Sequence, residues 1–137
     1  MAKARVLACG IAALALAGAA QAAPAPLFAS LQVTVLGVTQ AGGTLRVGVY
    51  DEATFPVLTD TPLFKRELAK ATGNVVVTFD RLPPGTYAVK VVQDVNNDGK
   101  WEMGEPYGVS NGAARDNFDA AAVVLQPGAN MVTVRLQ

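Results

Sequence analysis

VVVTFDRLPPGTYAVKV, residues 75–91, carries the clearest structural signal in this chain. On both sides of its Pro83-Pro84-Gly85 centre, apolar side chains occupy every second position. Alternation with period two is typical of a β-strand that buries one face and exposes the other. Proline fixes φ and glycine accepts a positive φ, so Pro84-Gly85 predicts a type II turn. We therefore expect Val75–Asp80 and Thr86–Gln93 to be neighbouring strands.

The same alternation recurs along the rest of the chain. It predicts strands containing Leu31, Val33 and Val35, then Leu45, Val47 and Val49, and finally Val132, Val134 and Leu136. Breaks rich in glycine or proline separate these runs, and no long amphipathic helix lies between them. Such a pattern predicts an all-β fold, an antiparallel sandwich or barrel, and we favour a β-sandwich of about seven strands.

Two segments allow more than one interpretation. Thr61-Pro62 and Gly73 are signals for the start and end of a helix, but Phe64–Lys70 lacks a helical apolar stripe. We favour a strand at Phe64–Lys70 and keep a helix over residues 61–72 as the alternative. Residues 113–122 suit a short helical turn before a strand at Ala121–Leu125.

The first 22 residues are organised like a secretory signal peptide. Two basic residues, Lys3 and Arg5, precede the uncharged run Val6–Ala20, and Ala20-Gln21-Ala22 offers small residues to a signal peptidase. A membrane anchor would need about twenty apolar residues, and the run Val6–Ala20 is shorter. Cys9 precedes most of the apolar run, which argues against a lipoprotein signal. We expect a signal peptide over residues 1–22, a linker over 23–30 and a domain over 31–137, periplasmic or extracellular, with no membrane span after cleavage.

Composition excludes several functions. The 137 residues include 11 basic and 11 acidic side chains and no histidine. A balanced charge argues against nucleic-acid binding, which requires a concentrated cationic surface. Without histidine, neither a Ser-His-Asp triad nor a histidine-based zinc site can form.

The segment DVNNDGKWEMGE, residues 94–105, matches the calcium-loop pattern D-x-[DN]-x-[DN]-G-x₅-E. Calcium prefers six to eight oxygen ligands, and a glycine at the sixth position permits the sharp turn. The loop holds four carboxylates and one lysine, and the four carboxylates repel one another unless a cation or full hydration separates them. We therefore expect calcium as the cofactor, with ligands from Asp94, Asn96, Asp98, the carbonyl of Lys100, Glu102 and Glu105.

The flanking sequence differs from an EF-hand. The preceding residues alternate as a strand, and Pro106 cannot continue a second helix because it lacks an N–H. Either Glu102 or Glu105 can therefore be the closing ligand. The alternative is a solvated turn with no ion, because Asn, Asp and Gly also dominate ordinary turns. For Trp101, inside the loop, we favour packing against the sandwich over a role as a stacking platform.

The segments Leu82–Val89, Asp94–Lys100 and Tyr107–Asn111 together resemble the bacterial family called domain of unknown function 2141. The resemblance extends from about Leu31 to the C-terminus. It implies a secreted or periplasmic Ig-like or transthyretin-like β-sandwich with no assigned activity. Family members often carry a histidine before the first loop aspartate, where this chain has Gln93.

Three functions remain in competition at this point. We favour a calcium-stabilised binding or interaction module with an unidentified protein or glycan partner in the cell envelope. The second is a structural envelope protein whose loop holds no ion. The third, which we disfavour, is a hydrolase that uses the loop carboxylates. We therefore expect no enzymatic activity and assign no catalytic residue.

Overall fold

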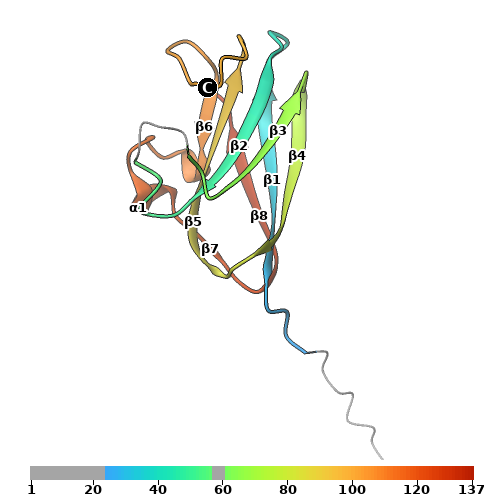
Figure 1. Ribbon diagram of the computed structural model, residues 1–137, viewed down its shortest axis with the longest axis vertical. Coiled ribbons are helices and arrows are strands. Elements are labelled where there is room, and N and C mark those ends of the chain that lie inside the picture. The colour runs from blue at the N-terminus through green and yellow to red at the C-terminus, as the bar shows by residue number, and fades with distance from the viewer. Residues whose placement is uncertain (1–23, 57–60) are drawn as a thin grey trace, which may run out of the picture.

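The computed structural model describes residues 24–56 and 61–137. The predicted signal peptide, residues 1–22, lies outside the described residues. Two β-sheets pack face to face (Figure 1), which confirms the predicted all-β sandwich. The described part of the chain contains no helix long and apolar enough to cross a membrane.

The smaller sheet has three strands in the order β4-β1-β8. They are β1 (Ala29–Val38), β4 (Gly73–Leu82) and β8 (Gly128–Arg135). Strand β1 begins two residues before Leu31, the expected start of the domain. β1 pairs with β4 in antiparallel and with β8 in parallel orientation, so one pairing departs from the antiparallel expectation.

The larger sheet has the order β3-β2-β5-β6, and β7 also pairs with β5. Its strands are β2 (Thr44–Tyr50), β3 (Phe64–Ala69), β5 (Gly85–Asp94), β6 (Tyr107–Val109) and β7 (Val123–Leu125). The strand interpretation of Phe64–Lys70 is therefore confirmed. A 3₁₀ helix, η1 (Ser110–Gly112), and the short helix α1 (Phe118–Ala121) lie between β6 and β7. The short helical turn is confirmed, and the strand after it begins at Val123.

The expected hairpin at Pro83-Pro84-Gly85 is wrong. β4 and β5 belong to different sheets, and Gly85 is not among the glycines with positive φ. Arg81 takes the positive φ instead, at 61°. Two consecutive prolines supply no N–H for a tight antiparallel pairing, so the chain crosses between the sheets. The Tyr87 hydroxyl donates to the Pro83 carbonyl at 2.7 Å, a contact similar to the tyrosine corner of Ig-like sandwiches.

The main core fills the space between the sheets. Alternate residues of β1, β2 and β5 are fully or almost fully buried there: Leu31, Val33, Val35, Leu45, Val47, Val49, Val89 and Val91. A second cluster covers part of the outer face of the larger sheet and contains Tyr50, Phe55, Ala88, Val109 and Ala121. This second cluster covers the outer face near α1, and beyond it lie the outward-facing side chains of β2, β3 and β5.

Candidate functional site

The 94–105 loop connects β5 to β6 at the end of the sandwich where β1 turns into β2 (Figure 1). The β1–β2 turn packs directly against the loop's first residue. A Cβ built on Gly43, whose φ is +83°, would lie 2.1 Å from the Asp94 carbonyl oxygen. The Thr44 hydroxyl donates to Asn97 Oδ1 at 2.6 Å. The loop is thus attached to the sandwich on the side of the β1–β2 turn.

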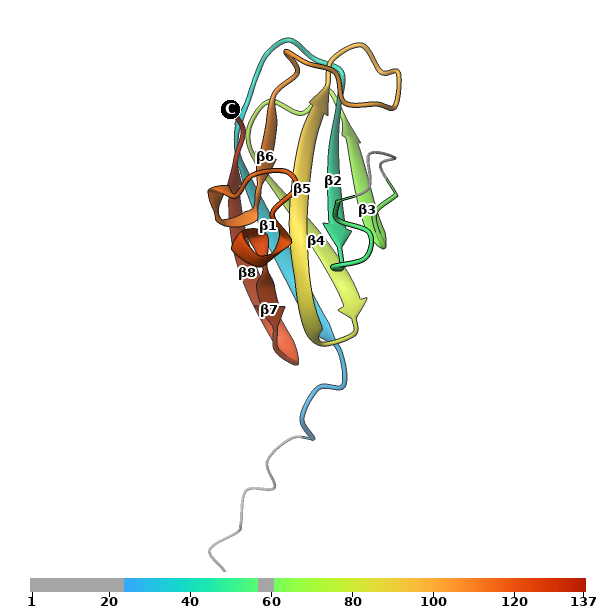
Figure 2. The same cartoon turned by 90° about the vertical axis from the view of Figure 1, so that its left-hand side faces the viewer.

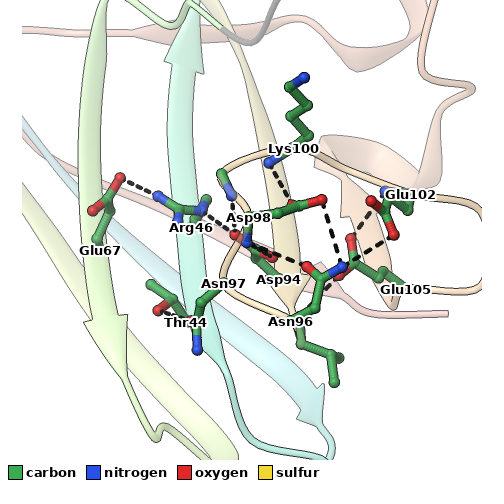
Figure 3. A network of polar contacts seen from close by, with 12 residues as sticks. Thr44, Arg46, Glu67, Asp94, Asn96, Asn97, Asp98, Lys100, Glu102 and Glu105 are labelled. Carbon is green, nitrogen blue, oxygen red and sulfur yellow. Dashed lines mark hydrogen bonds and ion pairs between the residues drawn. The ribbon is translucent and has the colours of Figure 1, made fainter.

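Asp94, the first residue of the motif, is fully buried and organises the beginning of the loop. Its Oδ2 accepts from the Gly99 amide at 2.8 Å and from Arg46 Nε at 2.9 Å. Its Oδ1 accepts from the Asp98 amide at 3.2 Å. Arg46 also forms an ion pair with Glu67 on β3 (Figure 3). Burial lowers the pKa of Arg46, but the Asp94 hydrogen bond and the two carboxylate charges outweigh it and raise the pKa.

Glu105, the last residue of the motif, closes the loop on itself. Its Oε1 accepts from the Val95 amide and its Oε2 from the Glu102 amide, both at 2.9 Å. The Trp101 indole N–H donates to the Glu105 carbonyl at 3.3 Å. Both carboxylate oxygens of Glu105 are therefore engaged by backbone donors of the same loop.

The middle of the loop brings Asn96, Asp98 and Glu102 together at the surface (Figure 3). Asn96 Nδ2 lies 3.5 Å from Asp98 Oδ2 and 3.1 Å from Glu102 Oε2, so the amide bridges the two carboxylates. The Lys100 amide donates to Asp98 Oδ1 at 2.9 Å. Contact with Asp98 and its charge raise the pKa of Glu102. The same contact and the Lys100 amide lower the pKa of Asp98.

The six predicted ligand residues therefore divide into two groups. Asp94 and Glu105 are engaged in holding the loop, and Asn96, Asp98 and Glu102 face one another, with Lys100 beside them. Within residues 24–56 and 61–137, no three Asp, Glu, His or Cys side chains come close enough to hold a metal ion. The donors that do converge are two carboxylates and one amide, all with hard oxygen atoms of the kind that calcium prefers.

Two residues contribute to the site in a way that was not predicted from the sequence. Arg46 occupies an outward position of β2, where a charged residue is ordinary, and its significance depends on pairing with β5 and β3. Gln93 is buried; its Oε1 accepts from the Thr39 amide at 2.9 Å, and its Nε2 donates to the carbonyls of Thr39 and Gly42 at 2.9 and 3.0 Å. These hydrogen bonds hold the β1–β2 turn against β5.

Trp101 packs against the sandwich, as we favoured. Its ring meets Tyr107 of β6 edge-on, with centroids 5.6 Å apart, and the Arg115 guanidinium carbon lies 3.7 Å from its ring centroid. Ser110, the serine that follows β6, is buried; its hydroxyl accepts from the Val89 amide at 3.0 Å and donates to the Ala121 carbonyl at 2.6 Å. That geometry ties η1 and α1 to β5.

Comparison with known proteins identifies a family but no activity. The family described as "Uncharacterized protein conserved in bacteria (DUF2141)" matches residues 33–133, and the chain belongs to this family. No curated protein matches the chain at a significant level. Two solved structures of a pilus-presented adhesin, Spy0125 (Cpa), are similar over 81% and 83% of this chain, at 12% and 11% identity and TM-scores of 0.30 and 0.28. The chain spans 27% of the adhesin's length, and a likeness at this level supports no statement about function.

Proposed function

We propose that this DUF2141 protein is an exported binding module whose 94–105 loop is stabilised by calcium. The proposed ligands are the carboxylates of Asp98 and Glu102, the amide oxygen of Asn96 and the carbonyl of Lys100. Asp94 and Glu105 act mainly as the frame of the loop. Export rests on the signal-peptide pattern of residues 1–22, and the partner is a protein or glycan of the cell envelope.

One observation carries the calcium proposal: the carboxylates of Asp98 and Glu102 share one exposed position, where the Asn96 amide bridges them. The side-chain hydrogen bond with Asp98 and the charge of Asp98 raise the pKa of Glu102, so the two carboxylates oppose each other's ionisation. A divalent cation would remove that opposition. Turning the Asn96 amide by 180° would present its oxygen, in place of its nitrogen, to the ion.

The expected contribution to stability is moderate. Extracellular calcium modules bind at about 10⁻⁴ to 10⁻³ M. At about 1 mM free calcium and a dissociation constant of about 0.1 mM, linkage gives about 1.4 kcal/mol. A domain of this size typically has a free energy of unfolding of about 5–15 kcal/mol, so the ion would add a measurable fraction.

Terbium luminescence tests the proposal, because terbium substitutes for calcium and Trp101 is the only tryptophan in the sequence. We expect tryptophan-sensitised emission that calcium displaces, and a higher melting temperature in calcium than in chelator. Asp98→Asn combined with Glu102→Gln should abolish both signals, whereas Glu52→Gln, an exposed acid outside the loop, should leave both intact. Loss of neither signal in the double variant would place the ion at another site, and absence of both signals in the wild type would favour the structural protein with no ion.

A further inference from the structure

A second feature lies beside the loop, on the outer face of the larger sheet. A cavity of about 580 Å³ opens there between β3, β2, β5 and β6. Residues 99–101 of the loop form one wall, and Arg115, which precedes α1, lies on the same side. Figure 2 shows the loop rising from this sheet at the end where β5 leads into it. The volume is within the range of about 300–1,000 Å³ that is typical of sites for small molecules.

The strand register explains why the sheet is hollow at this point. One cross-strand row consists of Lys65, Gly48, Lys90 and Val109, and the next consists of Glu67, Arg46, Val92 and Tyr107. Gly48 contributes no side chain to the centre of the first row. A Cβ placed there would lie 2.8 Å from the Tyr50 ring and 2.9 Å from Pro62. The missing side chain therefore lets Tyr50 and Pro62 approach the sheet, where both line the cavity.

The lining concentrates positive charge. Among the residues that the structure describes, five cations and one carboxylate, that of Glu67, line the cavity: Arg46, Lys65, Lys90, Lys100 and Arg115. The whole sequence, by contrast, has equal numbers of basic and acidic residues. Adding the adjacent Asp94 still leaves an excess of three positive charges. A concave surface of one sign focuses its field and raises the local concentration of ligands of the opposite sign.

The lining also offers aromatic and apolar surface. Trp101 and Tyr107 pack edge-on at an interplanar angle of 77°, and Arg115 lies above both rings, 3.7 Å and 5.4 Å from their centroids. Tyr50 lies opposite, with Lys90 Nζ 5.0 Å from its ring centroid. A guanidinium stacked on aromatic rings keeps its N–H edge available for a planar anion. Charged donors beside aromatic and apolar surface are the usual composition of a site for an organic anion.

We propose that this cavity binds a small organic anion with an aromatic or otherwise apolar body, a carboxylate, sulfonate or phosphate ester. Its acidic group pairs with Lys100 and Arg115, and with Lys65, whose Nζ also lies 3.4 Å from Glu67 Oε1. Its body lies against Trp101, Tyr107 and Val92. The proposal does not depend on calcium, because none of the side chains that would hold the anion is a proposed calcium ligand. Calcium in the loop would only fix the wall that contains Trp101.

Two fluorescent probes that differ by one sulfonate test the proposal. Anilinonaphthalenesulfonate is anionic, and N-phenylnaphthylamine is the same molecule without the sulfonate. We expect the anion to bind the folded full-length protein with energy transfer from Trp101, and the neutral probe to bind at least about tenfold more weakly, a difference of about 1.4 kcal/mol. Raising the ionic strength from about 0.01 M to about 1 M shortens the Debye length from about 30 Å to about 3 Å. This change should lower the affinity of the anionic probe and leave that of the neutral probe unchanged.

Charge variants complete the experiment. Lys65→Gln combined with Lys100→Gln removes two of the lining cations at exposed positions and should weaken the anionic probe about fivefold. Arg135→Gln, an exposed cation on the smaller sheet, is the matched control and should change nothing. Equal affinity for both probes, or equal loss in both variants, would overturn the proposal. Measurements in chelator and in calcium separate this outcome from failure of the calcium site, which the terbium signal reports.

Discussion

Asp94 is the residue whose removal tests the description of the loop most directly. It is fully buried, and Asp94→Ala deletes its ion pair with Arg46 and its hydrogen bonds from the amides of Gly99 and Asp98. Breaking a buried ion pair by removing one partner typically costs about 3–5 kcal/mol. Arg46 keeps its ion pair with Glu67, and the two amides belong to exposed residues that water can reach. We therefore expect the lower end, about 3 kcal/mol.

Chemical denaturation in chelator measures this loss without any contribution from calcium. For a domain of this size, about 3 kcal/mol corresponds to a decrease in melting temperature of about 10–15 °C. Asp80→Ala, an exposed acid on β4, is the matched control and should stay within about 0.5 kcal/mol of the wild type. A loss below about 1 kcal/mol in chelator would refute the frame role of Asp94. A loss that appears only in calcium would show that Asp94 acts as an ion ligand.

Three further perturbations separate the other roles. Glu102→Gln removes a carboxylate that Asp98 repels, so the free energy of unfolding in chelator should be unchanged or higher at neutral pH, and the increase in melting temperature with calcium should disappear. In the wild type, the pKa of Glu102 is raised, so acidification should reduce terbium emission at a higher pH than it would for an ordinary glutamate. Gly43→Ala should lower the free energy of unfolding by more than about 2 kcal/mol, because its Cβ would meet the Asp94 carbonyl at 2.1 Å. Gly99→Ala, at a similar φ but with open space around it, should lower it by about 1–2 kcal/mol, and urea titration measures both losses. Ser110→Ala should cost about 1–3 kcal/mol, because it leaves a buried amide and a buried carbonyl without their partner, and amide hydrogen exchange at the α1 end of β5 should become faster.

Local pattern predicted most of the strands but not β6, which has only three residues. Period-two alternation identified β1, β2, β4, β5 and β8, and the same reasoning favoured the correct strand over a helix at β3. The pairing of the strands could not be predicted in this way, because it depends on residues far apart in the sequence. The parallel contact of β1 with β8, from opposite ends of the domain, leaves no local signal. The error at Pro83-Pro84-Gly85 has the same origin, since turn chemistry cannot show whether the following strand stays in the same sheet.

The cavity shows the same limit for function. Its cations come from β2, β3, β5, the loop and the segment before α1, so no window of the sequence contains them together. Gly48 looked unremarkable as one residue of a strand, yet its missing side chain shapes the cavity once Lys65 and Lys90 lie on either side of it.

Residues 94–105 form a loop between two strands, but their side chains do not all have the roles that the calcium pattern predicts. The pattern requires oxygen at its first and last positions, and here those oxygens satisfy backbone amides and, for Asp94, the guanidinium of Arg46. A loop that leaves a strand, as this one does, cannot use a following helix for support, so its end residues supply the frame. The exposed residues in the middle of the loop are not needed to hold its shape; they are Asn96, Asp98 and Glu102. An ion bound there would change the stability of the loop without being required for its shape, which is why measurements in chelator and in calcium should separate the two sets of residues.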